Sequence, residues 1–250
     1  MTILASIQAR TGSIRLPGKV LKTIAGQPML QRQINRILKS DYIDKLVVAT
    51  SVNKNDDVIA DLCSKLGIEC FRGSEEDVLS RIARLLEEYP YENHAEFYGD
   101  SPLISPEVID GIAAKFLEKG AKWDCVCNSL ATTFPPGQEV IIYRSELLLD
   151  ADRKVSHTDP LREHCGIHVT TDKSLNVLNI EAPAEYHYPE LYMEVDTEKD
   201  FVVVSKVFEY FFEAGKEDFT LSDIIGFFTT YPELAALNSE EIRHWKSFRN

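Results

Sequence analysis

The sequence predicts a mixed α/β fold in which a mostly parallel sheet is flanked by helices. Over residues 1–120, apolar runs of strand length alternate with segments of helical period, which is the pattern of βαβ units. After residue 123, short strands are separated by proline and polar stretches, which favours a small antiparallel flap. With 250 residues, 44% of them hydrophobic, the chain can bury a full core, so we expect residues 1–250 to form a single domain.

The parallel part is expected to contain four strands and four helices. Residues 45–50 form a continuous apolar run, which suits a strand buried on both faces. Asp56 and Asp57 suit the positive N-terminal end of a helix that Gly67 would end. Pro106 suits the first turn of another helix. The strands are expected at residues 2–7, 45–50, 68–71 and 94–98, and the helices at residues 28–39, 56–66, 77–88 and 106–119.

The second half of the chain is expected to be less regular. Apolar stretches between prolines and polar residues predict short strands, and a strongly apolar helix follows them. Residues 215–250 are expected to form a helical C-terminal tail, with two short helices after Phe219. The strands are expected at residues 123–127, 138–143, 165–170 and 177–181, and the apolar helix at residues 198–214.

Composition and charge restrict the class of protein. No apolar run approaches the roughly 18 residues that a membrane span needs, and the N-terminus lacks a signal-peptide pattern, so we expect a cytoplasmic protein without a membrane partner. Five cysteines without a CxxC pair argue against a disulfide framework. A formal net charge of −13 repels polyanions, so we expect no nucleic-acid partner. An anionic small molecule must then be captured by a local cluster of cations.

Residues 8–19, QARTGSIRLPGK, form such a cluster directly behind the first expected strand. At the carboxyl end of a strand in an open α/β sheet, a loop is placed where ligands bind. Cationic side chains offer charge and forked donors to phosphate oxygens, and glycines allow backbone N–H groups to approach them. The spacing matches neither a P-loop nor a GxGxxG fingerprint. The cations and glycines of this predicted phosphate loop are Arg10, Arg15, Lys19, Gly12 and Gly18.

Two aspartates are expected at the same edge of the sheet. Asp100 follows the strand at 94–98, and Asp196 follows the apolar residues 192–195. Two carboxylates together with phosphate oxygens are ligands that Mg²⁺ prefers. Taken singly, each aspartate could equally cap a turn or a helix, whereas Thr197 and Asp200 are best explained as capping and first-turn residues.

Four segments resemble, in order, the signature segments of cytidylyltransferases of the spore-coat polysaccharide type, which are related to the CMP-Kdo and CMP-sialate synthetases. They are QARTGSIRLPGK with GQPML shortly after it, FRGSEEDVL, GDSPLI and VDTEKD, at residues 8–19, 26–30, 71–79, 99–104 and 195–200. The resemblance implies a Rossmann-like nucleotide-diphospho-sugar transferase fold of the GT-A-like type. It also implies that residues 128–190 form an insertion that caps the acceptor site and builds a homodimer interface.

The resemblance further implies transfer of CMP from CTP to a sugar acid, such as a nonulosonic or Kdo-like acid, with Mg²⁺ as cofactor and release of pyrophosphate. The implied catalytic residues are Lys19 at the α- or β-phosphate, Arg10 at the leaving pyrophosphate, and Asp100. The implied nucleotide-binding residues are Ala9, Arg10, Gly12, Ser13, Arg15, Lys19, Arg72 and Ser74. The implied acceptor-binding residues are Gln138, Glu139, Arg162 and His164, and the implied metal ligands are Asp100 and Asp196.

Three alternatives remain open at this point. Synthetases for Kdo usually carry an arginine where this chain has Val169, Thr170 and Thr171, so a small phosphate or phosphonate acceptor is possible. A GT-A-type glycosyltransferase would use a similar sheet, although such enzymes centre on a DxD signature and lack the RLPGK loop. A non-catalytic homologue could keep the fold alone. A zinc site at His164 and His168 is disfavoured, because the predicted strand there places the pair on no common helical face.

Overall fold

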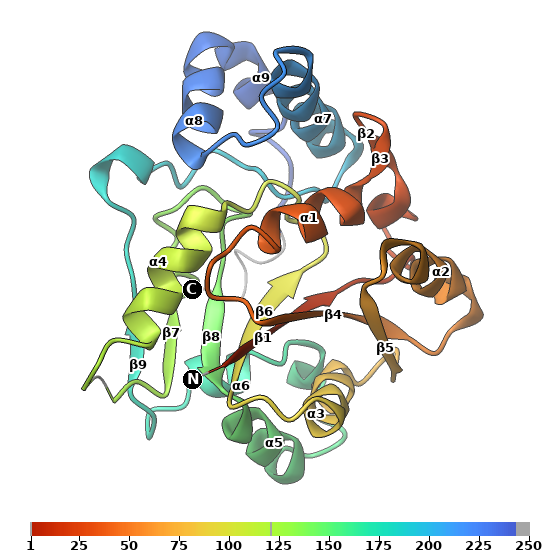
Figure 1. Ribbon diagram of the computed structural model, residues 1–250, viewed down its shortest axis with the longest axis vertical. Coiled ribbons are helices and arrows are strands. Elements are labelled where there is room, and N and C mark those ends of the chain that lie inside the picture. The colour runs from red at the N-terminus through yellow and green to blue at the C-terminus, as the bar shows by residue number, and fades with distance from the viewer. Residues whose placement is uncertain (1, 121, 244–250) are drawn as a thin grey trace.

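In the computed structural model, which describes residues 2–120 and 122–243, one seven-stranded sheet runs through the molecule (Figure 1). The strand order is β5-β4-β1-β6-β8-β7-β9. A separate antiparallel hairpin pairs β2 (Thr23–Ile24) with β3 (Gln27–Pro28). The strands of the large sheet are β1 (Ile3–Gln8), β4 (Lys45–Ser51), β5 (Glu69–Gly73), β6 (Asn93–Tyr98), β7 (Cys125–Cys127), β8 (Ile141–Arg144) and β9 (Val177–Asn179).

The strand directions bring several loops to one edge of the sheet. β1 lies between β4 and β6 and is parallel to both, and β5 is parallel to β4. The carboxyl ends of β1, β4 and β6, at Gln8, Ser51 and Tyr98, therefore lie at a common edge, where open α/β sheets bind ligands. β8 is antiparallel to β6 and to β7, whereas β9 is parallel to β7. The predicted mixed α/β fold with a mostly parallel sheet is confirmed.

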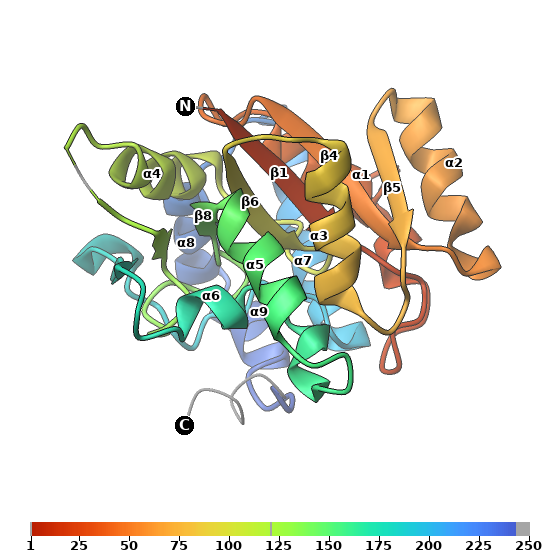
Figure 2. The same cartoon turned by 90° about the horizontal axis from the view of Figure 1, so that it is seen from below.

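Helices cover both faces of the sheet, and the view of Figure 2 shows α3, α5 and α6 together on one of them. This face carries α3 (Val78–Glu88), α5 (Ser145–Lys154) and α6 (Ile167–Thr170). The other side carries α1 (Met29–Ile37), α2 (Asp57–Leu66), α4 (Pro106–Phe116), α7 (Glu198–Glu213), α8 (Leu221–Thr230) and α9 (Pro232–Leu237). Short 3-10 turns are η1 (Lys19–Leu21), η2 (Lys54–Asp56), η3 (Pro160–Glu163) and η4 (Ala184–Tyr186). In the described residues no helix is long and apolar enough to span a bilayer.

Local signals explain where several helices begin. The Asp77 carboxylate accepts the Ser80 N–H at 2.9 Å and caps α3. Thr197 and Asp200 form a reciprocal capping box at the start of α7, which confirms the capping roles expected for them. Pro106 is at the first turn of α4. These caps fix the entry of each helix relative to the strand before it.

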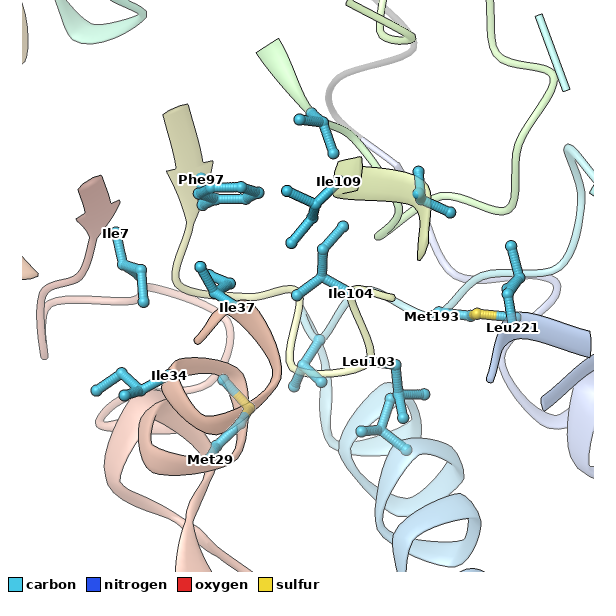
Figure 3. Packing of buried hydrophobic residues seen from close by; sticks show 14 of the residues in the cluster. Ile7, Met29, Ile34, Ile37, Phe97, Leu103, Ile104, Ile109, Met193 and Leu221 are labelled. Carbon is cyan, nitrogen blue, oxygen red and sulfur yellow. The ribbon is translucent and has the colours of Figure 1, made fainter. Parts of the chain in front are cut away.

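The main core joins the sheet to the C-terminal helices. In Figure 3, Ile7 of β1 and Phe97 of β6 lie above Ile37 of α1, and Met193 lies beside Leu221 of α8. All five side chains are almost fully buried in one hydrophobic cluster. The α7–α8 part of the chain is therefore packed against the same core as β1 and β6. It cannot shift without disturbing the residues next to the sheet edge.

One expected strand is absent from the structure, and one helix of the structure was not expected. The strand expected at 165–170 is wrong, because α6 and a preceding turn occupy this segment: the Thr170 N–H donates to the Gly166 carbonyl at 2.9 Å. Gly166 presses against the buried Glu96 side chain, since a Cβ at this position would lie 3.0 Å from Glu96 Oε2. α5 was not expected, because it follows β8 directly and no side chain caps its start. Because the strand is absent, it no longer argues against a zinc site at His164 and His168. The described residues, however, contain no cluster of three side chains that could bind a metal.

Candidate active site

The predicted phosphate loop leaves β1 at the common edge of the sheet and folds back on itself. The Gly18 N–H donates to the Thr11 carbonyl at 2.9 Å, with Gly18 in the left-handed region at φ 68°. Within the loop, the Leu16 N–H donates to Ser13 Oγ at 3.4 Å. Ile14, between these contacts, is 95% exposed. The loop is therefore closed at its base and open to solvent at its tip, where Gly12 is also exposed.

A buried carboxylate, which in the sequence alone suits only a helix start, fixes this loop. Asp56, at the end of η2, accepts the Thr11 N–H at 2.8 Å and the Thr11 hydroxyl at 2.7 Å. Its other oxygen accepts the Ser51 hydroxyl at 2.5 Å. Burial raises the pKa of Asp56, but these hydrogen bonds outweigh it and hold the pKa below its usual value. Asp56 thus ties the loop after β1 to the end of β4.

Lys19 lies at the centre of the site with its ammonium between two carboxylates. Its Nζ donates to the Val195 carbonyl at 2.7 Å and to Asp196 Oδ1 at 3.0 Å, and lies 3.5 Å from Asp100 Oδ2. The side chain is only 12% exposed. Burial lowers the pKa of Lys19, but the charges of Asp100 and Asp196 outweigh burial and raise the pKa above its usual 10.5. Lys19 is therefore a cation at all physiological pH values.

Arg15 completes this charged group from the loop side. Its Nη2 lies 2.7 Å from Asp196 Oδ2, and its Nη1 donates to the Ile242 carbonyl at 2.8 Å. Asp196 thereby contacts Lys19 with one oxygen and Arg15 with the other. The Val195 N–H donates to the Asp100 carbonyl at 2.8 Å, which holds the two aspartate segments side by side. The predicted residues Arg15, Lys19, Asp100 and Asp196 are thus brought together.

Asp100 and Asp196 are the residues that could hold a divalent cation. Their side chains are 31% and 16% exposed, so neither is sealed from solvent. In the part of the chain that the structure describes, no group of three or more His, Cys, Asp or Glu side chains could cage a metal. A Mg²⁺ ion would take two carboxylates from the protein and its other ligands from phosphate and water, as is usual for Mg²⁺ at phosphate sites. The two residues fit that cation.

Arg10 lies on the far side of the loop and reaches a different segment. Its Nη2 is 3.3 Å from Glu163 Oε1, and both side chains are about half exposed. An exposed pair of this kind contributes roughly 0–1 kcal/mol. The contact therefore leaves Arg10 able to exchange Glu163 for a more highly charged anion. Ala9, beside it, is buried, and its N–H donates to the Ala49 carbonyl at 3.2 Å.

Arg72 and Ser74, the expected nucleoside contacts, have partners of their own. Arg72 donates to the carbonyls of Ser51 and Asn53 at 3.0 and 2.9 Å. Its third nitrogen lies 2.7 Å from Asp57 Oδ1. Ser74 Oγ accepts the Asp77 N–H at 3.0 Å. These contacts brace the loops after β4 and β5, and a nucleoside contact by either residue stays a prediction.

Gln138 and Glu139 lie in a tight loop that packs against the Met193–Glu194 segment. Gln138 is fully buried; it accepts the Ser105 N–H at 2.9 Å and donates to the Leu103 carbonyl at 2.8 Å. Glu139 Oε2 accepts the Gly137 N–H at 2.7 Å. A Cβ at residue 137 would lie 2.8 Å from the Glu194 nitrogen, so this close approach requires glycine. Gln138 therefore supports the backbone near Asp100, and its contact with an acceptor stays a prediction.

Arg162 is buried in a network of ion pairs. Its Nε donates to Asp77 Oδ2 at 2.9 Å, its Nη1 donates to the Val155 carbonyl at 3.0 Å, and its Nη2 pairs with Asp152. An acceptor carboxylate would have to displace one of these carboxylates to reach the guanidinium. His164, two residues on, is half-buried. Acceptor binding by Arg162 and His164 stays a prediction.

A buried polar network underlies the sheet edge. Glu96 of β6 is fully buried and accepts the Tyr98 hydroxyl at 2.8 Å, the Tyr143 hydroxyl at 3.1 Å and the Gln8 amide at 3.1 Å. His94 Nδ1 lies 2.8 Å from the Tyr143 hydroxyl. Burial lowers the pKa of His94 to about 3, so the imidazole is neutral in the folded protein. The network ties the last residue of β1, before the phosphate loop, to β6 and β8.

Comparison with known proteins finds matches along most of the chain. A sequence model of the family described as cytidylyltransferase matches residues 4–210. The spore coat polysaccharide biosynthesis protein SpsF of Bacillus subtilis is 30% identical over 239 residues, which are 93% of this chain and 96% of that protein. The 3-deoxy-manno-octulosonate cytidylyltransferase of Chlamydia trachomatis is 30% identical over 182 residues, 65% of this chain and 68% of that protein.

The fold has a match among solved structures as well. A cytidylyltransferase from Leptospira borgpetersenii superposes with a TM-score of 0.86 at 26% sequence identity. The superposition covers 98% of this chain and 100% of that chain. The arrangement of sheet and helices is therefore shared along the whole length of the two proteins.

Proposed function

Because the chain belongs to the cytidylyltransferase family and is a CTP-dependent nucleotidyltransferase, we propose that it transfers CMP from CTP to a sugar acid and releases pyrophosphate. The observation that carries this proposal is the convergence of Lys19 and Arg15 with Asp100 and Asp196 at the base of the phosphate loop. Two cations and two carboxylates at one sheet edge suit a triphosphate with its divalent cation.

The residues of the loop would act mainly by placing positive charge. In the proposed step, a hydroxyl oxygen of the acceptor attacks the α-phosphorus and its proton passes to solvent, while the bond to the bridging oxygen breaks and pyrophosphate leaves with the bond electrons. Lys19 is held rigidly beside the carboxylates and would contact the α- or β-phosphate as its charge develops. Arg10 and Arg15, which are more exposed, would hold the leaving pyrophosphate. Gly12 and Ser13 would supply hydrogen bonds from the loop.

We propose Mg²⁺ as the cofactor, with Asp100 and Asp196 as its protein ligands. A bound Mg²⁺ supplies charge neutralisation and orientation of the phosphate oxygens. In the structure these two carboxylates are neutralised by Lys19 and Arg15. The charges of the site are therefore balanced within the chain. When a nucleotide and its cation bind, phosphate oxygens and the cation would replace some of the ion pairs of Lys19 and Arg15 with the two aspartates.

The proposed acceptor is a carboxylate-bearing sugar for surface polysaccharide assembly. The names of SpsF and of the 3-deoxy-manno-octulosonate cytidylyltransferase describe those proteins, and both support this class of product. The proposed acceptor residues come from the segment 128–190, which follows the nucleotide-side loops in the chain. We further propose that this segment forms a homodimer interface, which light scattering tests, and that the enzyme works in the cytoplasm.

The proposed function is tested by pyrophosphate release with Mg²⁺, each of the four NTPs and a panel of acceptors. The panel holds Kdo, sialic, legionaminic and pseudaminic acids, and small phosphates and phosphonates. We expect release with CTP and one sugar acid only. Release with a phosphate or phosphonate alone would replace the sugar acid in the proposal, and the absence of any nucleotide effect on turnover and melting temperature would overturn it.

A further inference from the structure

The segment around Arg243 reaches the candidate active site from outside the family match, which ends at residue 210. Arg243 follows α9 in the chain, and its side chain is only 1% exposed. Its Nη2 donates to Asp200 Oδ1 at 2.7 Å and to the Asn238 carbonyl at 3.0 Å. The guanidinium carbon lies 4.2 Å from the centre of the Tyr192 ring, which adds a cation–π contact. Arg243 is thus a buried cation held from three directions.

Asp200 binds Arg243 and also binds the backbone of the site. Its Oδ2 accepts the Asp196 N–H at 3.0 Å and the Thr197 N–H at 2.8 Å. Its Oδ1 accepts the Asn238 amide at 2.8 Å in addition to Arg243. Asp200 is fully buried, and it needs its cationic partner because an unpaired buried carboxylate is strongly unfavourable. One carboxylate therefore joins the residue 238–243 segment to the amides that set the direction of Asp196.

The same segment also contacts the phosphate loop directly. The carbonyl of Ile242, next to Arg243, accepts from Arg15 Nη1 at 2.8 Å. The other terminal nitrogen of Arg15 pairs with Asp196 Oδ2 at 2.7 Å. Arg15 therefore bridges the segment and Asp196, and the residues around 242–243 reach Asp196 by two independent routes.

We propose that Arg243 is a positioning residue for CMP transfer. It holds Asp200, Asp200 holds the Asp196–Thr197 backbone, and the Asp196 carboxylate is thereby fixed against Lys19 and Arg15. The fixed position of the Asp196 carboxylate matters for turnover only through the proposed function, in which Asp196 is a metal ligand. The hydrogen bonds that link Arg243 to Asp196 through Asp200 do not depend on that role, and their effect can be measured without CTP or metal.

The first test measures amide hydrogen exchange of the ligand-free protein in Arg243→Met and in Lys199→Gln. Lys199 is the matched control, because it ties the same segment through an ion pair with Glu241 at 2.8 Å, in which the lysine side chain is about half exposed, and its removal leaves the Asp200–Arg243 contact in place. We expect the amides of residues 196 and 197 to exchange at least tenfold faster in Arg243→Met and at the wild-type rate in Lys199→Gln. Unchanged exchange at these amides in Arg243→Met overturns the proposal.

The second test separates positioning from folding. Well below the melting temperature, we expect kcat/KM for CTP in Arg243→Met to fall by about tenfold to a hundredfold, because small displacements of a reacting group have effects of this size. Arg243→Lys, or Arg243→Ala with guanidinium added at a non-denaturing concentration, should recover part of the loss. Wild-type kcat/KM in folded Arg243→Met would overturn the proposal. If the wild-type enzyme itself turns over no acceptor, the proposed function fails while the exchange result still decides the link to Asp196.

Discussion

At the scale of single residues, Lys19 is the side chain whose contacts bear most directly on the proposed reaction. It donates to one carbonyl and one carboxylate and faces a second carboxylate, although it is only 12% exposed. A flexible lysine would lose much side-chain freedom on meeting a phosphate. Here that freedom is already restricted by the protein, so the ammonium is placed before the nucleotide arrives.

We expect Lys19→Met to lower kcat by a factor of about 100 to 1,000, as loss of one preorganised charge contact does in other enzymes. The matched control is Lys22→Met, which removes a more exposed lysine that pairs with Glu198 at 3.1 Å a few residues further on. Steady-state pyrophosphate release measures both variants, and circular dichroism checks their folding. Equal kinetic losses in the two variants would mean that the loop needs positive charge in general and not Lys19.

The charge of Lys19 also has a pH consequence. Because its pKa is raised in the folded protein, the stability it contributes is fully present below its usual value of 10.5 and is lost as pH rises through the raised value. We therefore expect no inflection from Lys19 in a pH–rate profile between pH 6 and about 9. If the profile of wild type showed an inflection between pH 6 and about 9, and Lys19→Met lacked it, then Lys19 would not be a permanent cation in this range.

At the scale of elements, the phosphate loop depends on the end of a neighbouring strand. Asp56 collects three hydrogen bonds from Thr11 and Ser51. Hydrogen bonds to a charged group contribute about 1.5–3 kcal/mol each, so Asp56→Ala should both destabilise the protein and loosen the loop. We expect KM for CTP to rise about tenfold, measured at a temperature where the variant is folded.

Asp61→Ala is the matched control for this prediction, because Asp61 is exposed on α2, the helix that follows Asp56. Asp61→Ala should leave KM for CTP unchanged and should shift the urea midpoint no more than other surface substitutions usually do. If Asp56→Ala lowers the urea midpoint but leaves KM for CTP unchanged, then the hydrogen bonds within the loop, such as Gly18–Thr11 and Leu16–Ser13, hold its shape without Asp56.

The elements that the sequence predicted well are those with strong local signals. β4 is a continuous apolar run, α2 has acids at its start and a left-handed Gly67 at its end, and α4 begins at Pro106. The short helix α6 was missed because its apolar residues also fit a strand. The burial of Glu96 against Gly166 decides between the two, and that contact joins residues 70 positions apart.

The site shows the same difference between features set by local sequence, which could be predicted, and features set by long-range contacts, which could not. Lys19 and Asp100 could be placed together because each follows a strand of the parallel part of the sheet, and the ends of parallel strands share an edge. Asp196 was expected at that edge after the apolar residues 192–195, which form no strand; the Val195 N–H donates to the Asp100 carbonyl at 2.8 Å and places Asp196 there. The partners of Arg72 and Arg162 could not be predicted, since which carboxylate an arginine meets depends on tertiary packing. Asp56 was recognisable only as a helix-start residue, because its hydrogen bonds to Thr11 run from η2, which follows β4, to the loop after β1.

At the scale of the whole molecule, the buried His94 makes folding sensitive to mild acid. Its pKa is lowered from 6.5 to about 3 by burial, so below pH 6.5 the unfolded chain binds a proton that the folded protein does not. The free energy of unfolding should therefore decrease as pH falls from 6.5, by up to about 1.4 kcal/mol per pH unit from this residue. Urea unfolding between pH 5 and 7 measures the slope.

His94→Asn tests the origin of that slope, because an amide keeps hydrogen-bonding capacity toward Ser6 and Tyr143 but does not titrate in this range. We expect the variant to be less stable than wild type at pH 7 and to show a smaller change between pH 7 and pH 5. An unchanged slope would assign the acid sensitivity to other groups, of which the hydrogen-bonded Asp56 acts only at lower pH.

The long sequence separation between partners in the site has a consequence for synthesis on the ribosome. Lys19 and Asp196 are 177 residues apart, and Arg15 and Ile242 are 227 residues apart. At translation rates of 5–20 residues per second, roughly 10–35 seconds pass between emergence of the phosphate loop and emergence of Asp196. During this interval the nascent chain displays Lys19 and Arg15 before their shared partner Asp196 has been made. The site can therefore reach its final geometry only after Asp196 and the residue 238–243 segment have both emerged.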